Sequence, residues 1–542
     1  MKRYLTLLAA VLAAVSCGGD DPVDPTPTPS APTTITLSKS SFEVAQAGET
    51  LSLDITAPTR PQQSGCPTWI TYKDGTYKDY KMTVGLTVAE NDTYESRTAE
   101  ITFSAAGVPS VKVTVTQAGK EYTPTPPDPS PSDNDAWKMA EWTGLGWNMG
   151  NHFDGYYNGS WAGDKEGYPD ETVWQPGESD AEKALNKATQ ATFDGVKAAG
   201  FTSVRIPVSW LKTIGPAPAY KIDEAWLNRV YEVARMASNA GLKVIVNTHH
   251  DENHGAANDY QWLDIKNAAN NAALNTQIKA EIKAVWTQIA EKFKDCDDWL
   301  ILESFNELND GGWGWSAEFQ ANPAKQCNIL NEWNQVFVDA VRATGGKNAT
   351  RWLGVPTYAA NPSFEQYFTM PEDPAKKTML AVHFYDPSSF TLGYDSDNDG
   401  NNDSMHMQWG HTAVSDKESW GNEEHVREVF GSLCTKYVQN GIPVYLGEFG
   451  CSKRASSDSR AWKFYLYYIE YVVKAAKTYG LSCYLWDNGA EGTGIEQHGY
   501  INHGTGSYIG NSKAVIDVMK KAWFTEAEGY TLDTVYKSAP KF

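Results

Sequence analysis

The feature that most constrains the fold is an alternation of short apolar runs with longer amphipathic segments between residues 136 and 542. Eight runs rich in apolar and β-branched residues predict strands at 144–150, 202–208, 243–249, 300–307, 351–357, 379–385, 443–449 and 482–488. Segments between them predict helices, and most end at a glycine that can cap a helix: 184–199, 224–240, 275–293, 331–344, 423–439 and 460–479. Such alternation of strand and helix predicts the α/β class and a (β/α)8 barrel.

A smaller all-β unit is predicted before the barrel, at residues 33–119. Strand-like alternation with turn residues between the runs occurs at 34–44, 49–57, 82–89, 99–105 and 111–117. This pattern predicts a small immunoglobulin-like β-sandwich. Stretches rich in Pro, Thr, Ser and Asp flank it at 18–32 and 120–135, and we expect both to be extended linkers.

Residues 1–17 have the character of a lipoprotein signal peptide. Lys2 and Arg3 precede an apolar stretch that is too short to span a bilayer, and Cys17 stands at the expected cleavage point. We therefore expect lipid attachment at Cys17, with ordinary secretion as the alternative. The acidic pair Asp20 and Asp21 resembles the surface-export signal of Bacteroidota lipoproteins, which implies a protein anchored in the outer membrane and exposed at the cell surface.

Composition narrows the classes of partner. The formal net charge of -21 and the pI near 4.9 argue against nucleic acid and anionic lipid as ligands, because both would be repelled. A neutral polymer is compatible with this charge, and 20 Trp and 28 Tyr provide many faces on which sugar rings could stack. The six cysteines after Cys17 show no metal-binding spacing, so we expect no zinc, and their pairing stays open.

Two glutamates end two of the predicted barrel strands, Glu307 and Glu448. Glycoside hydrolysis needs such a pair, one carboxyl that stays protonated and one that stays ionised. The carboxyl ends of barrel strands meet at one face, and other polar or aromatic residues end the same strands: Asn148, Arg205, His249, His250, Asn306, His383, Tyr385 and Trp486. The sequence therefore predicts a sugar-cleaving site at this face.

Seven short blocks in chain order carry a resemblance to glycoside hydrolase family 5, across essentially all of 136–542. They are GWNMGN (146–151), SVRIPV (203–208), NTHHD (247–251), FNE (305–307), VHFY (382–385), LGEFG (446–450) and WDNG (486–489). They look like the subfamily that holds endoglucanases, lichenases and xyloglucanases. The first unit resembles the BACON domain, on the segments PTWI (67–70), RTAEITF (97–103) and VKVTVTQ (111–117).

The family resemblance implies a retaining double displacement with Glu307 as acid/base and Glu448 as nucleophile, and with no metal or cofactor required. It implies Arg205 and Tyr385 beside Glu448, and sugar contacts from Asn148, Asn306, Trp486 and the three histidines. We attribute the proton on Glu307 to burial or to a neighbouring charge, which ionised Glu448 would supply.

The implied substrates are the β-1,4-glucans of plant cell walls, namely xyloglucan, mixed-linkage glucan or cellulose. A β-mannanase of the same family and a catalytically inactive surface glycan-binding protein are the alternatives. The BACON-like unit shows no cluster of exposed aromatic residues, so we expect a spacer, and Trp69 is expected in its core. We expect the whole protein to be a monomer.

Four further expectations concern single segments. Asp395, Asp397 and Asp399 reproduce the start of a calcium-binding loop, but position twelve is His406 rather than glutamate, and a solvated acidic turn is the alternative. His249 and His250, as neighbours on a strand, should point to opposite sides and so share no metal. Glu303 should be a structural partner of Arg205 or of a histidine. Tryptophans in loops after the first four strands are expected to set specificity: Trp161, Trp174, Trp210, Trp262, Trp313 and Trp315.

Overall fold

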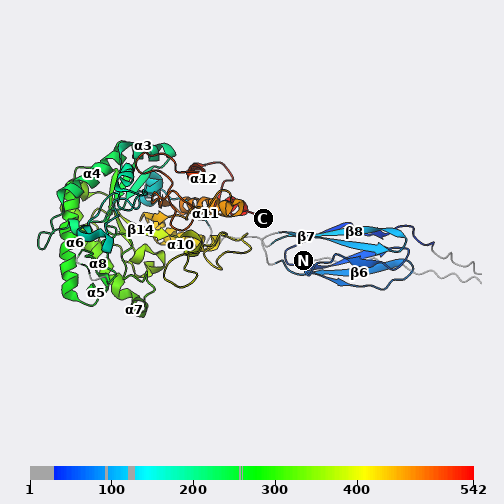
Figure 1. The fold of residues 1–542 in the computed structure, drawn as a ribbon. Coiled ribbons are helices and arrows are strands. Elements are labelled where there is room, and N and C mark those ends of the chain that lie inside the picture. Colours follow the sequence, from blue (N-terminus) through cyan, green and yellow to red (C-terminus); the bar gives the residue numbers. More distant parts are fainter. Residues whose placement is uncertain (1–29, 92–95, 120–127, 256–257, 259) are drawn as a thin grey trace, which may run out of the picture. The chain divides into compact units, whose positions relative to one another are not determined.

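The computed structural model describes residues 30–91, 96–119, 128–255, 258 and 260–542. The chain divides into two compact units, Met1–Thr123 and Pro124–Phe542, and Figure 1 shows the described parts of each as ribbons. The predicted signal peptide with Cys17, most of the first linker and residues 120–127 of the second lie outside the described residues. Within the described ranges, no helix combines the length and the apolar character that crossing a bilayer requires.

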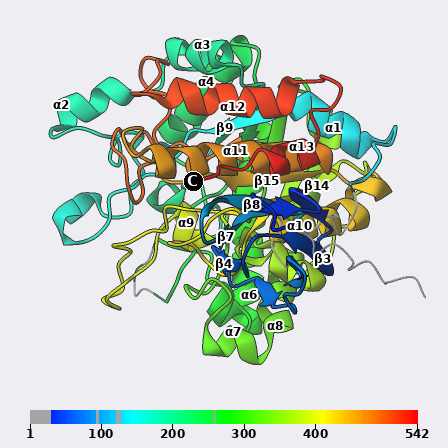
Figure 2. The ribbon, with the colours of Figure 1, turned by 90° about the vertical axis from the view of Figure 1, so that its right-hand side faces the viewer.

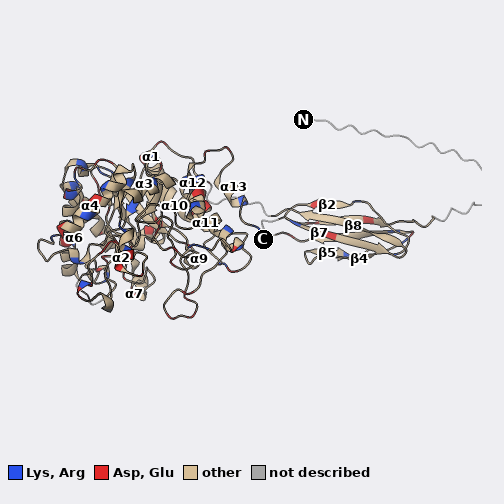
Figure 3. Cartoon of the chain, turned by 45° about the horizontal axis from the view of Figure 1, so that its top comes forward, with Lys and Arg blue, Asp and Glu red and all other residues tan. Residues whose placement is uncertain are grey.

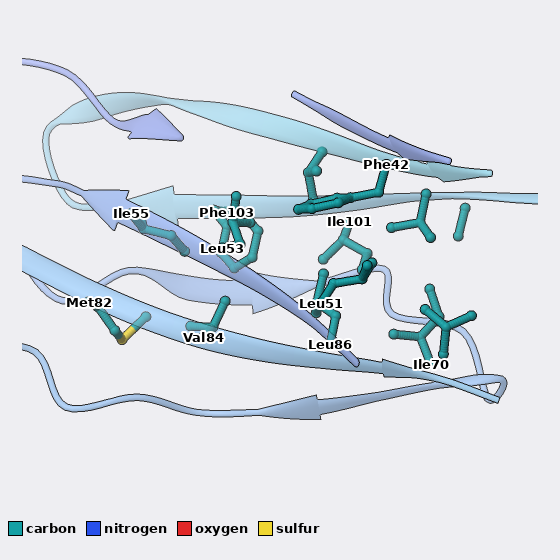
Figure 4. Close-up of a cluster of buried hydrophobic side chains, with 14 of the residues drawn as sticks. Phe42, Leu51, Leu53, Ile55, Ile70, Met82, Val84, Leu86, Ile101 and Phe103 are labelled. Carbon is teal, nitrogen blue, oxygen red and sulfur yellow. The ribbon is translucent and has the colours of Figure 1, made fainter. Parts of the chain in front are cut away.

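The first unit is a sandwich of two four-stranded sheets, as predicted. One sheet has the strand order β1 (Thr36–Leu37), β3 (Glu49–Thr56), β6 (Lys81–Val88), β5 (Ile70–Lys73), and the other β2 (Ser41–Val44), β8 (Val108–Gln117), β7 (Arg97–Ala105), β4 (Gln62–Ser64). Side chains alternate between buried and exposed along β3 and β6, because successive residues of a strand face opposite sides. The inward-facing apolar side chains meet between the sheets, where Phe42, Leu53, Ile101 and Phe103 lie in the core (Figure 4).

Details of the sandwich differ from the prediction in two places. The predicted strand 34–44 is two strands in different sheets, and β2 pairs with β8 in parallel. Strands β4 and β5 were not predicted, because both are short and lack a clear apolar alternation. Trp69 is half-buried against the core, with the Arg97 guanidinium 4.5 Å from the centre of its ring, which confirms a packing role.

The second unit is a closed barrel of eight parallel strands, which confirms the predicted (β/α)8 fold. Its strands follow one another around the barrel in chain order: β9 (Leu145–Asn148), β10 (Ser203–Ile206), β11 (Lys243–Val246), β12 (Leu300–Glu303), β13 (Leu353–Pro356), β14 (Thr378–Phe384), β15 (Val444–Phe449) and β16 (Leu481–Leu485). Strand β16 pairs with β9 and closes the ring. Every strand overlaps one of the predicted runs, because a barrel strand is apolar on the side that faces the helices.

Helices surround the strands on the outside of the barrel (Figures 1 and 2). The long ones are α3 (Gln190–Ala199), α4 (Glu224–Asn239), α6 (Ala272–Lys292), α8 (Pro323–Ala343), α10 (Glu423–Lys436), α11 (Ser459–Thr478) and α12 (Ser512–Phe524). The short ones are α1 (Asp135–Thr143), α2 (Asp180–Lys183), α5 (Ile265–Ala268), α7 (Ala317–Ala321), α9 (Ser388–Thr391) and α13 (Leu532–Lys537). Residues of both charge signs are interspersed along α4 and α6 (Figure 3).

Two helix starts differ from the prediction by more than three residues. Helix α3 begins at Gln190 rather than 184, because Ala184–Asn186 form a separate 3-10 turn. Helix α8 begins already at Pro323, where proline at the first helical positions leaves no required hydrogen bond unmade.

Large side chains face glycines inside the barrel. A Cβ atom on Gly146 of β9 would lie 2.2 Å from the Tyr484 ring, and one on Gly354 of β13 would lie 2.1 Å from the Tyr445 hydroxyl. The two tyrosines thus fill the space that the glycines leave. Together with Met139 of α1 they belong to an apolar cluster, which we call the barrel floor: Met139, Ile245, Ile301, Met379, Ala381, Tyr445 and Tyr484.

The end of the second predicted linker contacts the barrel unit. The Asp128 carboxylate pairs with the Arg427 guanidinium of α10, which is fully buried and also donates to Asp533 of α13 at 2.6 Å. Asn134 caps α1, and its side-chain amide donates to the Val438 carbonyl at 2.8 Å. Residues from Asp128 onward are therefore anchored to the barrel.

Candidate active site

Arg205 of β10 is the centre of a buried polar network at the carboxyl ends of the strands. Its guanidinium donates to Glu303 at 2.7 Å, to Glu448 at 2.8 Å, to Asn306 at 2.8 Å and to Asn148 at 3.1 Å. The side chain is fully buried, and two carboxylates balance its charge. Such a fully satisfied network fixes the positions of its members. The contact with Glu303 confirms the structural role expected for that residue.

Glu448 is presented to the site by a bulge in β15. The register between β14 and β15 shifts there, so that Glu448 lies opposite His383 while Gly447 is the extra residue. A Cβ atom on Gly447 would lie 2.9 Å from the His383 ring, which explains the glycine. The Tyr385 hydroxyl donates to Glu448 at 3.0 Å, so Arg205 and Tyr385 both hold this carboxylate, as expected.

Glu307 follows β12 and lies close to Glu448. Its carboxylate is 2.5 Å from Nδ1 of His383, and the same nitrogen is 3.8 Å from Glu448. One carboxylate oxygen of Glu307 lies within 4.8 Å of one of Glu448. Retaining glycosidases have their two carboxyl groups about 5–5.5 Å apart and inverting ones about 6.5–9.5 Å. The short spacing fits a retaining pair.

The surroundings of the two carboxyls differ. Burial raises the pKa of Glu307 to about 7, although Arg205 and His250 oppose this shift. The sequence left two causes open for the raised pKa of Glu307, burial and the charge of Glu448. Burial is the main cause. Burial also raises the pKa of Glu448, but the Arg205 and Tyr385 hydrogen bonds favour its ionised form. Glu307 is therefore the better proton carrier and Glu448 the better carboxylate.

The two asparagines have different surroundings. Asn306 accepts from Arg205 through its carbonyl oxygen, which directs its NH2 group away from that contact and leaves it as a donor for a ligand. Asn148 is fully buried, accepts from Arg205 and donates to the carbonyls of Gly447 at 2.9 Å and Tyr484 at 3.2 Å. The sugar contact expected for Asn148 is wrong, because its carboxamide is used at both ends inside the protein. It supports Arg205 and the bulge.

His249 and His250 lie on one side rather than on opposite sides. Their ring centroids are 4.4 Å apart, because β11 ends at Val246 and strand alternation no longer holds beyond it. Burial lowers the pKa of His249 well below its usual value. Burial would also lower the pKa of His250, but the hydrogen bond and charge of Glu252 and the charge of Asp154 raise it to about 9.

The two histidines and Asp154 bring ligand atoms within 4.8 Å of one another. A histidine binds metal through its neutral form. The charge that Glu252 and Asp154 favour on His250 makes this ring a donor to carboxylates and ligand hydroxyls. Sequence reasoning did not select Asp154 and Glu252, although each stands only a few residues beyond a signature block.

Trp486 follows β16 and forms a wall of the site. Its ring is parallel to that of His249, with centroids 6.0 Å apart, and a Cβ atom on Gly150 would lie 2.5 Å from it. The ring is half-buried, so a sugar ring can reach part of it. The accessible part of the ring is an apolar face of the kind on which a sugar ring can stack.

The six tryptophans that were predicted to set specificity fall into three groups. Trp210 is fully buried and donates to the Asn247 carbonyl, so the specificity role expected for it is wrong. Trp174 and Trp262 are half-buried, and Trp262 donates to Asp251 at 2.8 Å. Trp161, Trp313 and Trp315 are 63%, 50% and 71% exposed.

The acidic loop after β14 brings carboxylate oxygens of Asp395, Asp397 and Asp399 within 4.8 Å of one another. Oxygens of Asp395 accept from the backbone of Asp399 and Gly400, as in a tight turn. His406 pairs with Asp416 at 3.0 Å. The three carboxylates suit a hard cation such as calcium, but no carboxylate stands at position twelve.

Comparisons with known proteins agree with this geometry. Residues 168–492 match the family model of cellulase, glycosyl hydrolase family 5, and residues 60–118 match that of the N-terminal BACON domain. Endoglucanase A of Paenibacillus barcinonensis is 35% identical over 66% of this chain and 82% of its own. A xyloglucan-specific endo-β-1,4-glucanase of Bacteroides ovatus is 33% identical over 83% of this chain and 86% of its own.

A solved structure also resembles the barrel unit. The broad-specificity endoglucanase of Bacteroides salanitronis is 44% identical, with a TM-score of 0.64, over 75% of this chain and 99% of that one. The family model covers more than half of the chain, and the aligned part contains Glu307, which follows β12, and Glu448 of β15. This chain is a glycoside hydrolase and belongs to glycosyl hydrolase family 5, with a BACON domain before the barrel.

Proposed function

We propose that this protein is a retaining endo-β-1,4-glucanase that cleaves internal bonds of plant cell-wall β-glucans, with Glu307 as acid/base and Glu448 as nucleophile. The observation that carries the proposal is the approach of the two carboxylates within 4.8 Å in unlike surroundings. Glu307 has its pKa raised to about 7 by burial, while Glu448 is held by Arg205 and Tyr385.

In the first step, a carboxylate oxygen of Glu448 attacks the anomeric carbon and forms a glycosyl ester. The bond to the leaving oxygen breaks, and that oxygen takes the proton of Glu307. Arg205, at 2.8 Å, keeps Glu448 ionised before the attack. The NH2 group of Asn306 would bind the sugar 2-hydroxyl, a bond that strengthens as positive charge develops on the ring.

In the second step, Glu307, now ionised, takes a proton from water, and the water oxygen attacks the anomeric carbon. The ester bond breaks and Glu448 leaves as a carboxylate, which the Tyr385 hydroxyl stabilises by its hydrogen bond at 3.0 Å. His383, 2.5 Å from Glu307, keeps that carboxyl in place through both steps. Two inversions at the anomeric carbon leave its configuration retained.

A glucan substrate is supported by the relatives, whose names include endoglucanases and a xyloglucan-specific glucanase. The test is the release of reducing ends by the full chain from xyloglucan, mixed-linkage β-glucan, carboxymethylcellulose and mannan in parallel. We expect activity on at least one glucan above that on mannan. Mannan as the best substrate would favour the mannanase alternative, and inactivity on all four would favour a glycan-binding protein.

We propose a spacer role for the sandwich. The large apolar residues that are exposed in the described chain all lie in the barrel unit, so the sandwich offers no aromatic platform there. Its Trp69 ring packs under Arg97. Affinity electrophoresis of residues 33–119 in a gel that contains soluble glucan should show no retardation, and clear retardation would contradict the spacer role.

We also propose that the protein is a monomeric outer-membrane lipoprotein, anchored through Cys17 and exposed at the surface. The sequence pattern before Cys17 and the acidic pair after it support this. Cys17→Ala should abolish incorporation of labelled fatty acid in the host cell and release the protein from the membrane fraction. Light scattering of the soluble chain should give the mass of one copy.

The proposed reaction uses side chains and water only. Calcium would be a structural ion, held by Asp395, Asp397 and Asp399. Calorimetric titration of calcium into chelator-treated protein tests this, with Asp397→Asn as the variant that should lose the heat. No heat from the parent would remove calcium from the account.

A further inference from the structure

We propose that a cavity at the end of the barrel opposite the two catalytic glutamates is a second binding site for β-glucan, in which Trp142 and Trp352 stack on sugar rings. The site holds a segment of polymer that the catalytic residues do not contact. Its ligand is the polymer of the proposed function, on which the proposal rests.

The cavity lies at the end of the barrel where the strands begin. Trp142 stands near the end of α1, just before β9, and Trp352 directly precedes β13. Lys377, which also lines the cavity, directly precedes β14. Parallel strands all begin at one face of a barrel and end at the other. The two catalytic glutamates follow or end their strands and therefore lie at the opposite face.

The size and the apolar lining of the cavity suit a short run of sugars. Its volume is about 500 Å³, which is within the range of about 300–1,000 Å³ that small-ligand pockets have. Met139 and Leu300 form apolar parts of its wall. Trp142 and Trp352 pack against the barrel floor but stay partly exposed. Exposed aromatic rings are surfaces on which the apolar faces of sugars stack.

The two rings are held in place, and each keeps a polar atom for a ligand. The Lys377 ammonium lies 4.3 Å from the centre of the Trp352 ring, and the Lys243 ammonium lies 5.4 Å from that of Trp142. In the part of the chain that the structure describes, neither indole N–H group has a hydrogen-bond acceptor, so both can donate to a sugar hydroxyl. Rings that are positioned before the ligand arrives lose little conformational entropy on binding.

The charges around the cavity favour a neutral ligand. The charged residues of its lining are of both signs: Asp135, Lys138, Asp298, Arg351 and Lys377. Lys377 pairs with Asp135 at 3.0 Å, and Lys138 pairs with Asp133 at 2.7 Å, so neither lysine is left to select an anion. A neutral ligand with apolar faces and hydroxyl groups at its edges matches this cavity, and β-glucan is such a ligand.

The test measures polymer binding by the full chain that carries Glu448→Ala, which binds glucan without cleaving it. Affinity electrophoresis in gels with increasing amounts of xyloglucan or of mixed-linkage β-glucan gives an apparent Kd. Adding Trp142→Ala and Trp352→Ala together should raise this Kd about tenfold, because two stacking surfaces are lost. With Glu448 intact, the same pair should leave kcat/KM on an activated aryl β-cellobioside within about twofold of the parent, since so short a substrate occupies only the catalytic face.

Three further variants separate binding from packing. Trp352→Phe keeps a ring and should retain most of the binding. Thr350→Met places a longer side chain at the exposed rim without removing any packing, and should weaken binding as well. Trp299→Ala is the matched control and should change nothing, because Trp299 is half-buried at the same end of the barrel but its ring faces Arg235 of α4 instead of the cavity.

An apparent Kd that the double variant leaves unchanged would overturn the second site. If the double variant also loses activity on the aryl glycoside, Thr350→Met decides, and undiminished binding by that variant would overturn the site. Inactivity of the parent on every glucan would instead refute the proposed function, and the binding test would stand, because it needs no turnover.

Discussion

The barrel floor and the mouth, which is the end of the barrel where Arg205, Glu303 and Glu448 lie, are built from the same strands. Apolar side chains fill the floor, whereas charged side chains fill the mouth. At the floor, Met139 packs on apolar residues of the strands, such as Ile301. At the mouth, two strand residues farther along β12, Glu303 pairs with the fully buried Arg205. The Tyr445 hydroxyl of the floor donates to Glu303 at 2.7 Å and joins the two layers. The comparison teaches that apolar packing in one layer stabilises the barrel, while the compensated charges of the other perform the chemistry.

Replacing Glu448 with Ala tests the mouth most strongly. The nucleophile is lost, so kcat on glucan should fall by at least about 10⁴-fold, while binding of the polymer persists. Steady-state kinetics and affinity electrophoresis measure the two effects. Glu470→Ala, which removes a carboxylate of α11 on the outside of the barrel, is the control and should keep parental activity. A Glu448→Ala variant as active as the parent would contradict the assignment.

Arg205→Lys should lower both the activity and the stability of the protein. Lysine cannot reproduce the four partners of the guanidinium, so kcat should fall roughly 10²–10³-fold and the free energy of unfolding by about 3–5 kcal/mol. Kinetics and urea unfolding measure these changes. Arg229→Lys is the control, because Arg229 lies on α4, outside the network of Arg205, and is partly exposed. Activity within a few-fold of the parent for Arg205→Lys would show that the network is not needed for catalysis.

The pH dependence should report the proton of Glu307. Its pKa of about 7 predicts that kcat/KM falls tenfold per pH unit above that pH, because the acid has then lost its proton. The raised pKa also means that the folded protein binds this proton more tightly than the unfolded chain. Stability should therefore fall as the pH rises from about 4.5 to about 7. Glu307→Gln should remove that change in stability. A parent enzyme whose kcat/KM does not fall between about pH 7 and about pH 9 would contradict the assignment.

Met139→Ala tests the floor. The cavity should lower the free energy of unfolding by about 2–5 kcal/mol and leave kcat/KM at 25 °C within about twofold of the parent. Urea unfolding and initial rates are the two measurements. A variant that keeps its stability but loses activity would mean that floor and mouth are not separable as described.

Arg427 sharpens the comparison, because it is a buried guanidinium outside the mouth. Asp128→Asn removes a carboxylate partner of this guanidinium, so the free energy of unfolding should fall by about 1–2 kcal/mol without loss of activity. Asp133→Asn is the control, since Asp133 pairs with Lys138 on the surface and should change little. Equal stability of both variants would show that Asp128 does not anchor the linker.

The sequence was sufficient for the parts of the fold and site that depend on local pattern. All eight barrel strands could be predicted from apolar runs, because strand alternation with helices acts on short stretches of chain. The contacts of Arg205 and Tyr385 with Glu448 were implied by the resemblance of short sequence blocks to glycoside hydrolase family 5.

Features that depend on distant segments could not be predicted. The bulge at Gly447 requires the His383 ring on the neighbouring strand, and the internal use of Asn148 requires carbonyls of β16 and of that bulge. The pairing of Asp128 with Arg427 joins residues far apart in sequence. His249 and His250 were placed wrongly because strand geometry was extended beyond the end of β11.

The most direct test of the central claim is to trap the glycosyl ester. A 2-deoxy-2-fluoro cellobioside with an activated aryl leaving group should form the ester, and the fluorine should slow its hydrolysis, because it destabilises the positive charge of both transition states. Mass spectrometry should show one added cellobiosyl group per chain, carried by the peptide that contains Glu448. Modification of another residue, or no adduct together with inverted products from the parent enzyme, would contradict the account.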